Sequence, residues 1–198
     1  MAVSKFQTET AIREAYHAGQ RLFGENRVQE LVGKHPVLPD DVEWHFIGTL
    51  QTNKVKYIAP FISMIQSVDT LKLMQAIDYQ AGKCNRIIRI LLEIHISKEI
   101  SKHGFTIDEC RMLFLEGLPS HFKYIHICGL MGMATFTDES KVVRREFRNL
   151  RRLFEEISAL PEVDKSLFSE LSMGMSDDYK IAIEEGSTMI RIGSAIFN

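Results

Sequence analysis

The chain has 198 residues with a formal net charge of −2, and 45% of the residues are hydrophobic and 25% charged. This balance is typical of one globular domain, and the near-neutral charge offers nucleic acid no general attraction. Three separated cysteines without a CxxC pair argue against disulfides or a zinc site, and no apolar run is long enough to span a bilayer, so we expect a cytoplasmic protein without metal, nucleic-acid or membrane partners.

Short β-rich runs alternate with amphipathic segments along the whole chain, without a linker. This rhythm predicts one α/β domain over residues 1–198, built from βα units around a parallel sheet. The expected strands are Ala2–Lys5, Arg21–Gly24, Glu43–Gly48, Met64–Val68, Ile88–Ile96, Ile125–Met131, Leu167–Ser172 and Met189–Ile192. The expected helices are Thr8–Ala18, Val28–Gly33, Asn53–Phe61, Leu71–Ala81, Ile107–Glu116, Ser140–Ala159 and Asp177–Glu185.

Several helix ends carry the residues that helix ends need. A glycine at position 19, 82, 117 or 186 follows a predicted helix, where a left-handed residue is wanted. Eight strands with seven intervening helices favour a single (β/α)8 TIM-type barrel. A doubly wound open sheet stays open as the alternative, because periodicity cannot show closure.

In such a barrel, functional groups gather where the strands end and the following loops begin. Polar residues stand at most of these positions: Lys5, Glu25–Asn26, Gln51–Lys54, Ser101–His103, Met131–Thr135, Ser172–Asp178 and Arg191–Ser194. Lys5 ends the first predicted strand. An ammonium at the end of an apolar strand is costly to desolvate, which favours the nucleophilic amine that forms an imine with an aldehyde. The alternative is a surface lysine at a strand terminus.

Two small-residue turns follow the last two predicted strands. One contains Gly174 and Ser176 and opens a predicted helix, and the other reads Arg191-Ile-Gly-Ser194. Barrels often bind phosphate between these two loops, although a pair of ordinary glycine turns would read the same way. These features alone do not choose between pyridoxal 5′-phosphate (PLP) and a sugar phosphate handled by a Schiff-base aldolase.

Seven sequence blocks choose between them, because they run in order along almost the whole chain. They are AVSK at Ala2–Lys5, FGENRVQE at Phe23–Glu30, WHFIGTLQTNK at Trp44–Lys54, SKHGF at Ser101–Phe105, GLMGMA at Gly129–Ala134, LSMGMSDD at Leu171–Asp178 and GSTMIRIGSAIF at Gly186–Phe197. With these blocks the sequence resembles the pyridoxal phosphate homeostasis proteins, which are similar to the barrel domain of alanine racemase. Relatives usually carry a helical segment before the AVSK strand, and the sequence given begins inside that strand.

The resemblance implies a fold-type III PLP barrel without the second, β-rich domain of alanine racemase. It makes Lys5 the Schiff-base residue and places Arg191 opposite the pyridine nitrogen of the cofactor. Around the phosphate it implies Ser176, Gly193 and Ser194, and as further residues lining the cofactor Asn26 and either Met131 or Met133. Asn26 and the two methionines could equally be packing residues.

The position of Arg191 that the resemblance implies also predicts a non-catalytic role. A charged guanidinium donates to the ring nitrogen and disfavours its protonation, which makes the cofactor a poor electron sink. We therefore expect a monomer that holds PLP on Lys5 for PLP homeostasis and delivery to apo PLP-dependent enzymes. A weak amino-acid racemase is the alternative. Lys102, after the fifth predicted strand, is either a second amine that meets PLP at the mouth or a spectator.

Overall fold

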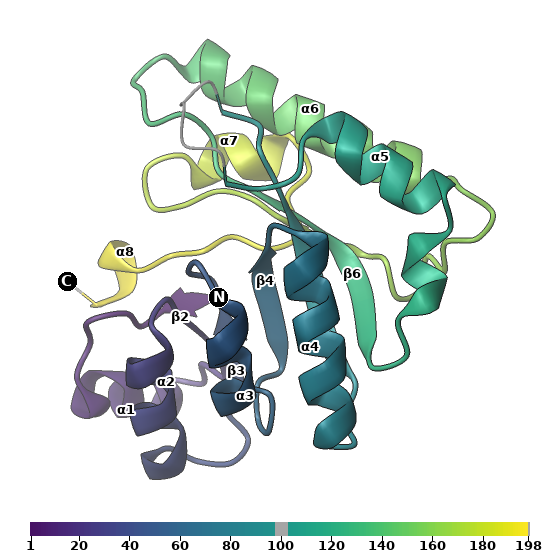
Figure 1. Ribbon diagram of the computed structural model, residues 1–198. Coiled ribbons are helices and arrows are strands. Elements are labelled where there is room, and N and C mark those ends of the chain that lie inside the picture. The colour runs from purple at the N-terminus through teal and green to yellow at the C-terminus, as the bar shows by residue number, and fades with distance from the viewer. Residues whose placement is uncertain (98–102, 198) are drawn as a thin grey trace.

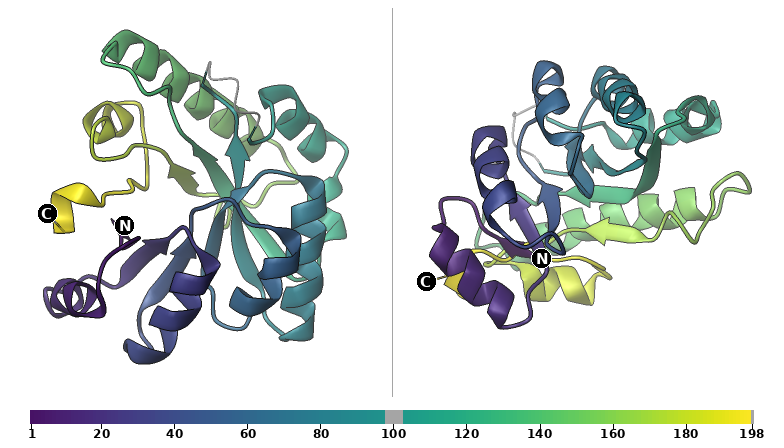
Figure 2. Two further views of the ribbon diagram at one scale, coloured as in Figure 1. Left: turned by 60° about the vertical axis from the view of Figure 1, so that its left-hand side comes forward. Right: turned by 90° about the horizontal axis from the view of Figure 1, so that it is seen from below.

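The computed structural model describes residues 1–97 and 103–197 and shows an α/β fold in which a curved sheet is surrounded by helices (Figure 1; Figure 2, left). Within these residues seven parallel strands pair strictly in chain order. They are β1 (Ala2–Val3), β2 (Leu22–Glu25), β3 (Glu43–Phe46), β4 (Met64–Val68), β5 (Ile88–Ile94), β6 (Ile125–Gly132) and β7 (Glu170–Ser172). The expectation of parallel strands that curl into a barrel-like sheet is confirmed.

A helical segment connects each strand to the next. The α-helices are α1 (Glu9–His17), α2 (Val28–Lys34), α3 (Val55–Ile58), α4 (Leu71–Lys83), α5 (Ile107–Leu115), α6 (Ser140–Ser158), α7 (Tyr179–Glu184) and α8 (Ser194–Phe197). Short 3₁₀ turns are η1 (His35–Val37), η2 (Thr52–Lys54) and η3 (Leu118–His121). None of the helices in the described part of the chain is long and apolar enough to cross a membrane.

The eighth predicted strand, Met189–Ile192, is the main departure from expectation. It forms only isolated parallel bridges, from Met189 to Ser172 of β7 and from Ile192 to Ala2 of β1. The amide of Arg191 donates to the carbonyl of Gly174 at 2.9 Å, and Gly174 has a left-handed φ of 96°, which interrupts a regular ladder.

The same segment nevertheless joins the two edges of the sheet. The Val3 amide donates to the Ile192 carbonyl at 2.7 Å, and the Ile192 amide donates to the Met1 carbonyl at 3.1 Å. In Figures 1 and 2 the last part of the chain, in yellow, lies beside the first, in purple. We call residues 1–3 and 189–193 the seam, because there the beginning and the end of the described chain are paired.

The core consists of the sheet and the inward faces of the helices. All five residues of β4 are buried, as expected for a parallel strand covered on both faces. On α6 the buried side chains recur at helical spacing, so one stripe faces the sheet while the arginines, Glu155 and Glu156 face outward. This explains the basic clusters of α6 as a solvated helix face that is paired with acidic residues.

Three of the four predicted glycine caps are confirmed and one is wrong. Gly19, Gly117 and Gly186 have positive φ angles directly after helical segments. Gly82 instead lies inside α4, where a Cβ atom would come within 2.8 Å of the Tyr124 ring. Asn85, with φ of 50°, takes the left-handed position after that helix.

Candidate functional site

Lys5, Asn26, Met133 and Ser176 each follow the end of a strand, so the parallel sheet brings them to one end of the fold. Lys5 lies in a turn after β1, and its side chain is exposed. This exposure does not match the desolvated ammonium that we expected at the end of an apolar strand. The reason is local: β1 ends already at Val3, and Phe6 adopts a left-handed φ of 64° that turns the chain outward.

The two predicted phosphate-binding turns meet. The Ser194 hydroxyl donates to the Ser176 hydroxyl at 3.1 Å, which joins the loop after β7 to the start of α8. Gly193 lies against β1, where a Cβ atom would come within 3.3 Å of the Val3 carbonyl oxygen. Helix α7 begins at Tyr179, two residues later than predicted, because the Asp178 carboxylate accepts from the Met175 amide and belongs to the preceding turn.

Arg191 is buried beside these turns. Its Nη1 donates to the Ser172 hydroxyl at 2.7 Å and to the Ser172 carbonyl at 2.9 Å, and its Nη2 donates to the Gly132 carbonyl at 3.0 Å. Burial lowers the pKa of Arg191 to about 10, and the carboxylates of Asp178 and Glu93 oppose this effect. The guanidinium is therefore charged at neutral pH and held in one orientation.

A chain of hydrogen-bonded, buried polar side chains leads from Arg191 to residues of three strands, β7, β4 and β3. The Ser172 hydroxyl donates to Gln66 Oε1 at 2.7 Å, and Gln66 Nε2 lies 2.9 Å from His45 Nδ1. Burial lowers the pKa of His45 to about 3, so the imidazole is neutral, and Nδ1 is the acceptor of the Gln66 amide. Ser172 thus holds the guanidinium of Arg191 directly, and Gln66 and His45 hold Ser172 in place.

Sequence reasoning missed these side chains because they come from three different strands. One signal was available: His45 and Gln66 interrupt strands whose other residues are mostly apolar. A polar residue inside a buried strand needs a hydrogen-bond partner, and that partner is often a site residue.

Asn26 follows β2 at the same end of the fold. Its side chain is half-buried, and its Oδ1 atom is buried without a hydrogen-bond partner among the described residues. Its backbone is pressed against Gly48 of the loop after β3, where a Cβ atom would come within 2.2 Å of the Asn26 carbonyl oxygen. An unpaired buried acceptor at this end of the sheet fits a ligand that brings a donor.

The two candidate methionines separate clearly. Met131 is buried in a small cluster with Met64, Leu91 and Cys128, so it is a packing residue. Met133 follows β6 and is 43% exposed, so Met133 is the one that can reach a ligand. Lys102 and Ser101 lie outside the described residues.

Glu93, near the end of β5, is a further site residue that sequence reasoning missed. The residue is 9% exposed, and burial raises the pKa of its carboxyl group above the usual range. The negative charge of Asp69 adds to the rise, whereas the charge of Arg191 opposes it. Because the net shift is upward, desolvation outweighs the attraction to Arg191.

We expect Glu93→Gln to raise the free energy of unfolding at pH 7. A carboxyl with a raised pKa binds its proton more firmly in the folded state, so stability falls as pH rises above the usual carboxyl pKa of about 4. Glutamine keeps the shape without this cost. Urea unfolding at pH 7 and at pH 4 measures the effect, and the gain should shrink at the lower pH. An equal gain at both values would contradict the assignment.

Comparisons with known proteins agree with this geometry. The family model for the N-terminal domain of alanine racemase matches residues 1–198. A pyridoxal phosphate homeostasis protein of Aquifex aeolicus is 40% identical over 201 residues, which cover 100% of this chain and 85% of that protein. The pyridoxal phosphate homeostasis protein of Schizosaccharomyces pombe is 36% identical over 200 residues, which cover 100% of this chain and 82% of that protein.

Solved structures place the fold in the same group. The structure of PipY of Synechococcus elongatus, solved with PLP bound, superposes with a TM-score of 0.86 at 34% sequence identity. The alignment covers 100% of this chain and 91% of the PipY chain. The structure of alanine racemase of Clostridium difficile has a TM-score of 0.76 at 12% identity, and the alignment covers 98% of this chain and 50% of the racemase chain. At this identity the similarity is one of fold alone. By sequence and by fold, this chain belongs to the pyridoxal phosphate homeostasis protein family.

Proposed function

We propose that this chain binds PLP at the seam and holds it as a Schiff base on Lys5. One observation carries the proposal: the 2.7 Å hydrogen bond from the Val3 amide to the Ile192 carbonyl. Lys5 follows Val3 by two residues, and Arg191 and Ser194 flank Ile192. The bond therefore brings the segment that carries Lys5 next to the segment that carries Arg191 and Ser194.

The chemistry of these groups fits each part of PLP. The hydroxyls of Ser176 and Ser194 can donate to the phosphate, and the guanidinium of Arg191 can donate to the pyridine nitrogen. Asn26 Oδ1 is a buried acceptor without a partner among the described residues. When bound, the cofactor supplies an aldehyde; the amine nitrogen of Lys5 forms a double bond to its carbon, and the aldehyde oxygen leaves as water.

The environment of Arg191 supports holding rather than turnover. A permanently charged donor opposite the pyridine nitrogen disfavours protonation of the ring, and an unprotonated ring withdraws electrons poorly. The hydrogen-bonded side chains of Ser172, Gln66 and His45 keep this donor in place. We therefore propose a non-catalytic, monomeric, cytoplasmic protein that keeps PLP available to apo PLP-dependent enzymes. Long incubation with single amino-acid enantiomers tests this, since accumulation of the opposite enantiomer would favour a weak racemase.

Absorbance and peptide mapping test the binding site directly. Protein mixed with PLP should show a visible imine band. Borohydride reduction should then fix the cofactor covalently, and peptide mapping should find it on Lys5. A band that maps to another lysine, or the absence of a band, would reject the proposal.

We expect Ser176→Ala and Ser194→Ala each to weaken PLP binding without preventing the imine. Each removes one charge-assisted hydrogen bond to phosphate, a loss of about 1.5–3 kcal/mol, or roughly 10- to 100-fold in affinity. Titration of PLP, followed at the imine band, measures this. Ser166→Ala is the control, because that exposed hydroxyl bonds only within its own turn, to Asp164. Unchanged affinity in both site variants would place the phosphate elsewhere.

A further inference from the structure

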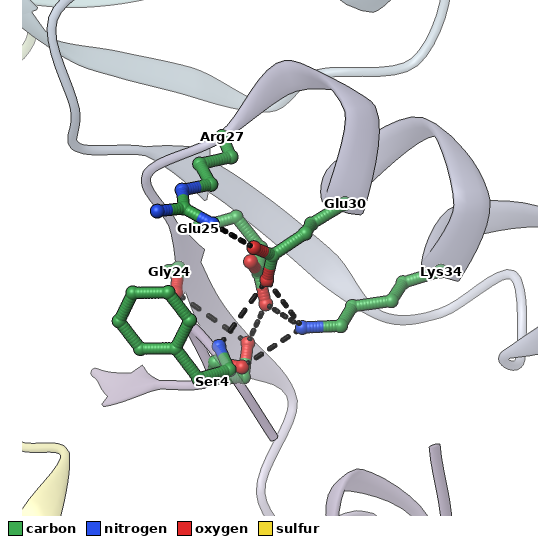
Figure 3. A network of polar contacts seen from close by, with 7 residues as sticks. Ser4, Gly24, Glu25, Arg27, Glu30 and Lys34 are labelled. Atoms are coloured by element: carbon green, nitrogen blue, oxygen red, sulfur yellow. Dashed lines mark hydrogen bonds and ion pairs between the residues drawn. The ribbon is translucent and has the colours of Figure 1, made fainter. Parts of the chain in front are cut away.

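Four charged or polar residues form a network beneath the turn that carries Lys5 (Figure 3). Ser4 directly follows β1, Glu25 comes from β2, and Glu30 and Lys34 come from α2. Glu25 is fully buried, and the side chain of Lys34 is only 13% exposed. We call Glu25, Glu30 and Lys34 the clamp, because all three bond to the chain beside Lys5 or to one another.

Lys34 is the centre of the clamp. Its Nζ lies 2.8 Å from Glu25 Oε1, 2.9 Å from the Ser4 carbonyl oxygen and 3.5 Å from Glu30 Oε2. An ammonium has three N–H donors, and three acceptors surround this one. All three donors of Lys34 therefore have acceptors nearby. One of these acceptors is a backbone group, the carbonyl of Ser4, the residue directly before Lys5.

The clamp also holds the chain on the other side of Lys5. The Phe6 amide donates to Glu30 Oε2 at 3.2 Å, and the Ser4 hydroxyl donates to Glu25 Oε1 at 2.6 Å. The backbone is thus tied down one residue before and one residue after Lys5. In Figure 3 dashed lines join Lys34 to Glu25, Glu30 and Ser4.

The turn needs such support. A left-handed φ of 64° is disfavoured for a bulky residue such as Phe6, which is also 63% exposed and so gains little from burial. The guanidinium of Arg27, which pairs with Glu30, lies 4.8 Å from the centre of the Phe6 ring. A backbone held in a disfavoured conformation by surrounding groups is a recurrent feature of functional sites.

A buried ion pair is a weak source of stability, because the cost of desolvating both charges offsets their attraction. The Glu25–Lys34 pair therefore requires another explanation. We infer that the clamp positions Lys5 for imine formation, so that Glu25, Glu30 and Lys34 are positioning residues for the reaction of Lys5 with PLP. This rests on the proposed function, in which Lys5 is the amine that holds the cofactor.

Two variants test the clamp from opposite ends. Lys34→Met removes the central cation, and Glu30→Gln weakens the contact to the Phe6 amide at a more exposed position. The rate of imine formation with PLP should fall about 10-fold in each, because the amine loses its orientation. Affinity for pyridoxine 5′-phosphate, which has the same ring and phosphate but no aldehyde, should stay unchanged. Lys34→Arg keeps the charge and should recover most of the rate.

Amide exchange gives a readout that does not depend on the cofactor. In the apo protein, exchange of the Phe6 amide should accelerate about 10-fold in Lys34→Met, while amides of β4 stay protected. Lys83→Met is the matched control, since Lys83 also lies in the last turn of a helix, where its ammonium packs over the Tyr79 ring and not against the turn after β1. If Lys34→Met does not fold, Glu30→Gln carries both measurements, because Glu30 is not part of the buried pair.

Two results would overturn the clamp. One is an imine rate and a Phe6 exchange rate equal to those of the parent in both variants. The other is an equal loss of affinity for pyridoxine 5′-phosphate, which would mean general damage rather than loss of positioning. Failure of the proposed function looks different: the parent protein itself would then carry no cofactor on Lys5 after borohydride reduction.

Discussion

Replacing Lys5 with alanine is expected to abolish the imine band of the PLP-loaded protein completely, while leaving the fold intact. The chemical reason is that no other side chain in the turn after β1 has a primary amine. The structural reason is that Lys5 is exposed, so its removal leaves no cavity and should change the free energy of unfolding by no more than about 0.5 kcal/mol. PLP should still bind, more weakly, through the groups that hold its phosphate and ring.

Three measurements separate these effects. Absorbance reports the imine, urea unfolding reports stability, and fluorescence quenching by PLP reports residual binding. Lys83→Ala serves as the control, because it removes a lysine from the opposite end of the sheet. A Lys5→Ala protein that kept the full imine band would show that another amine holds the cofactor.

Replacing Gly48 with alanine is expected to have the largest effect on stability among substitutions at the site. A Cβ atom at this position would lie 2.2 Å from the carbonyl oxygen of Asn26 and 2.8 Å from its carbonyl carbon. Both neighbours are backbone atoms, so the loops after β2 and β3 must move apart. Overpacking of this kind costs about 3 kcal/mol. The movement also displaces Asn26, so PLP affinity should fall together with stability.

Gly33→Ala is a control with the opposite sign. Gly33 lies within α2, and a Cβ atom there would meet nothing within 4 Å. Alanine is the better helix former by about 0.5–1 kcal/mol, so this variant should be slightly more stable than the parent. Urea unfolding of both variants decides the matter: a Gly48→Ala protein as stable as Gly33→Ala would refute the close approach of the two loops.

Local sequence patterns were sufficient for most of the fold. The strand Met64–Val68 has the predicted bounds, and the predicted helix Thr8–Ala18 matches α1 with its N-cap Thr8 and C-cap Ala18. Both depend on patterns within a few residues, such as a continuous apolar run or a threonine that caps the following turn. The pairing of Ser176 with Ser194 also agrees with the expected phosphate loops, because parallel strands bring their following loops together.

What the sequence could not provide depends on contacts between distant segments. The strand at Met189–Ile192 has the right composition, but its pairing is interrupted by the left-handed backbone at Gly174 on the neighbouring segment. The exposure of Lys5 depends on where β1 stops pairing with β2. For the clamp, the i,i+4 spacing of Glu30 and Lys34 predicts their pairing, but nothing local indicates that both reach the turn after β1.

The seam has a consequence for how the molecule is assembled. Contacts between residues 1–3 and 189–193 close a very long loop, so their entropy cost is high and we expect them to form late in folding. The site proposed for PLP lies on these contacts, with Lys5 on one side and Arg191 and Ser194 on the other. A partly folded chain therefore has no complete site. PLP that binds only the closed form would stabilise that form by mass action. The cofactor would then hold the two segments of the seam together.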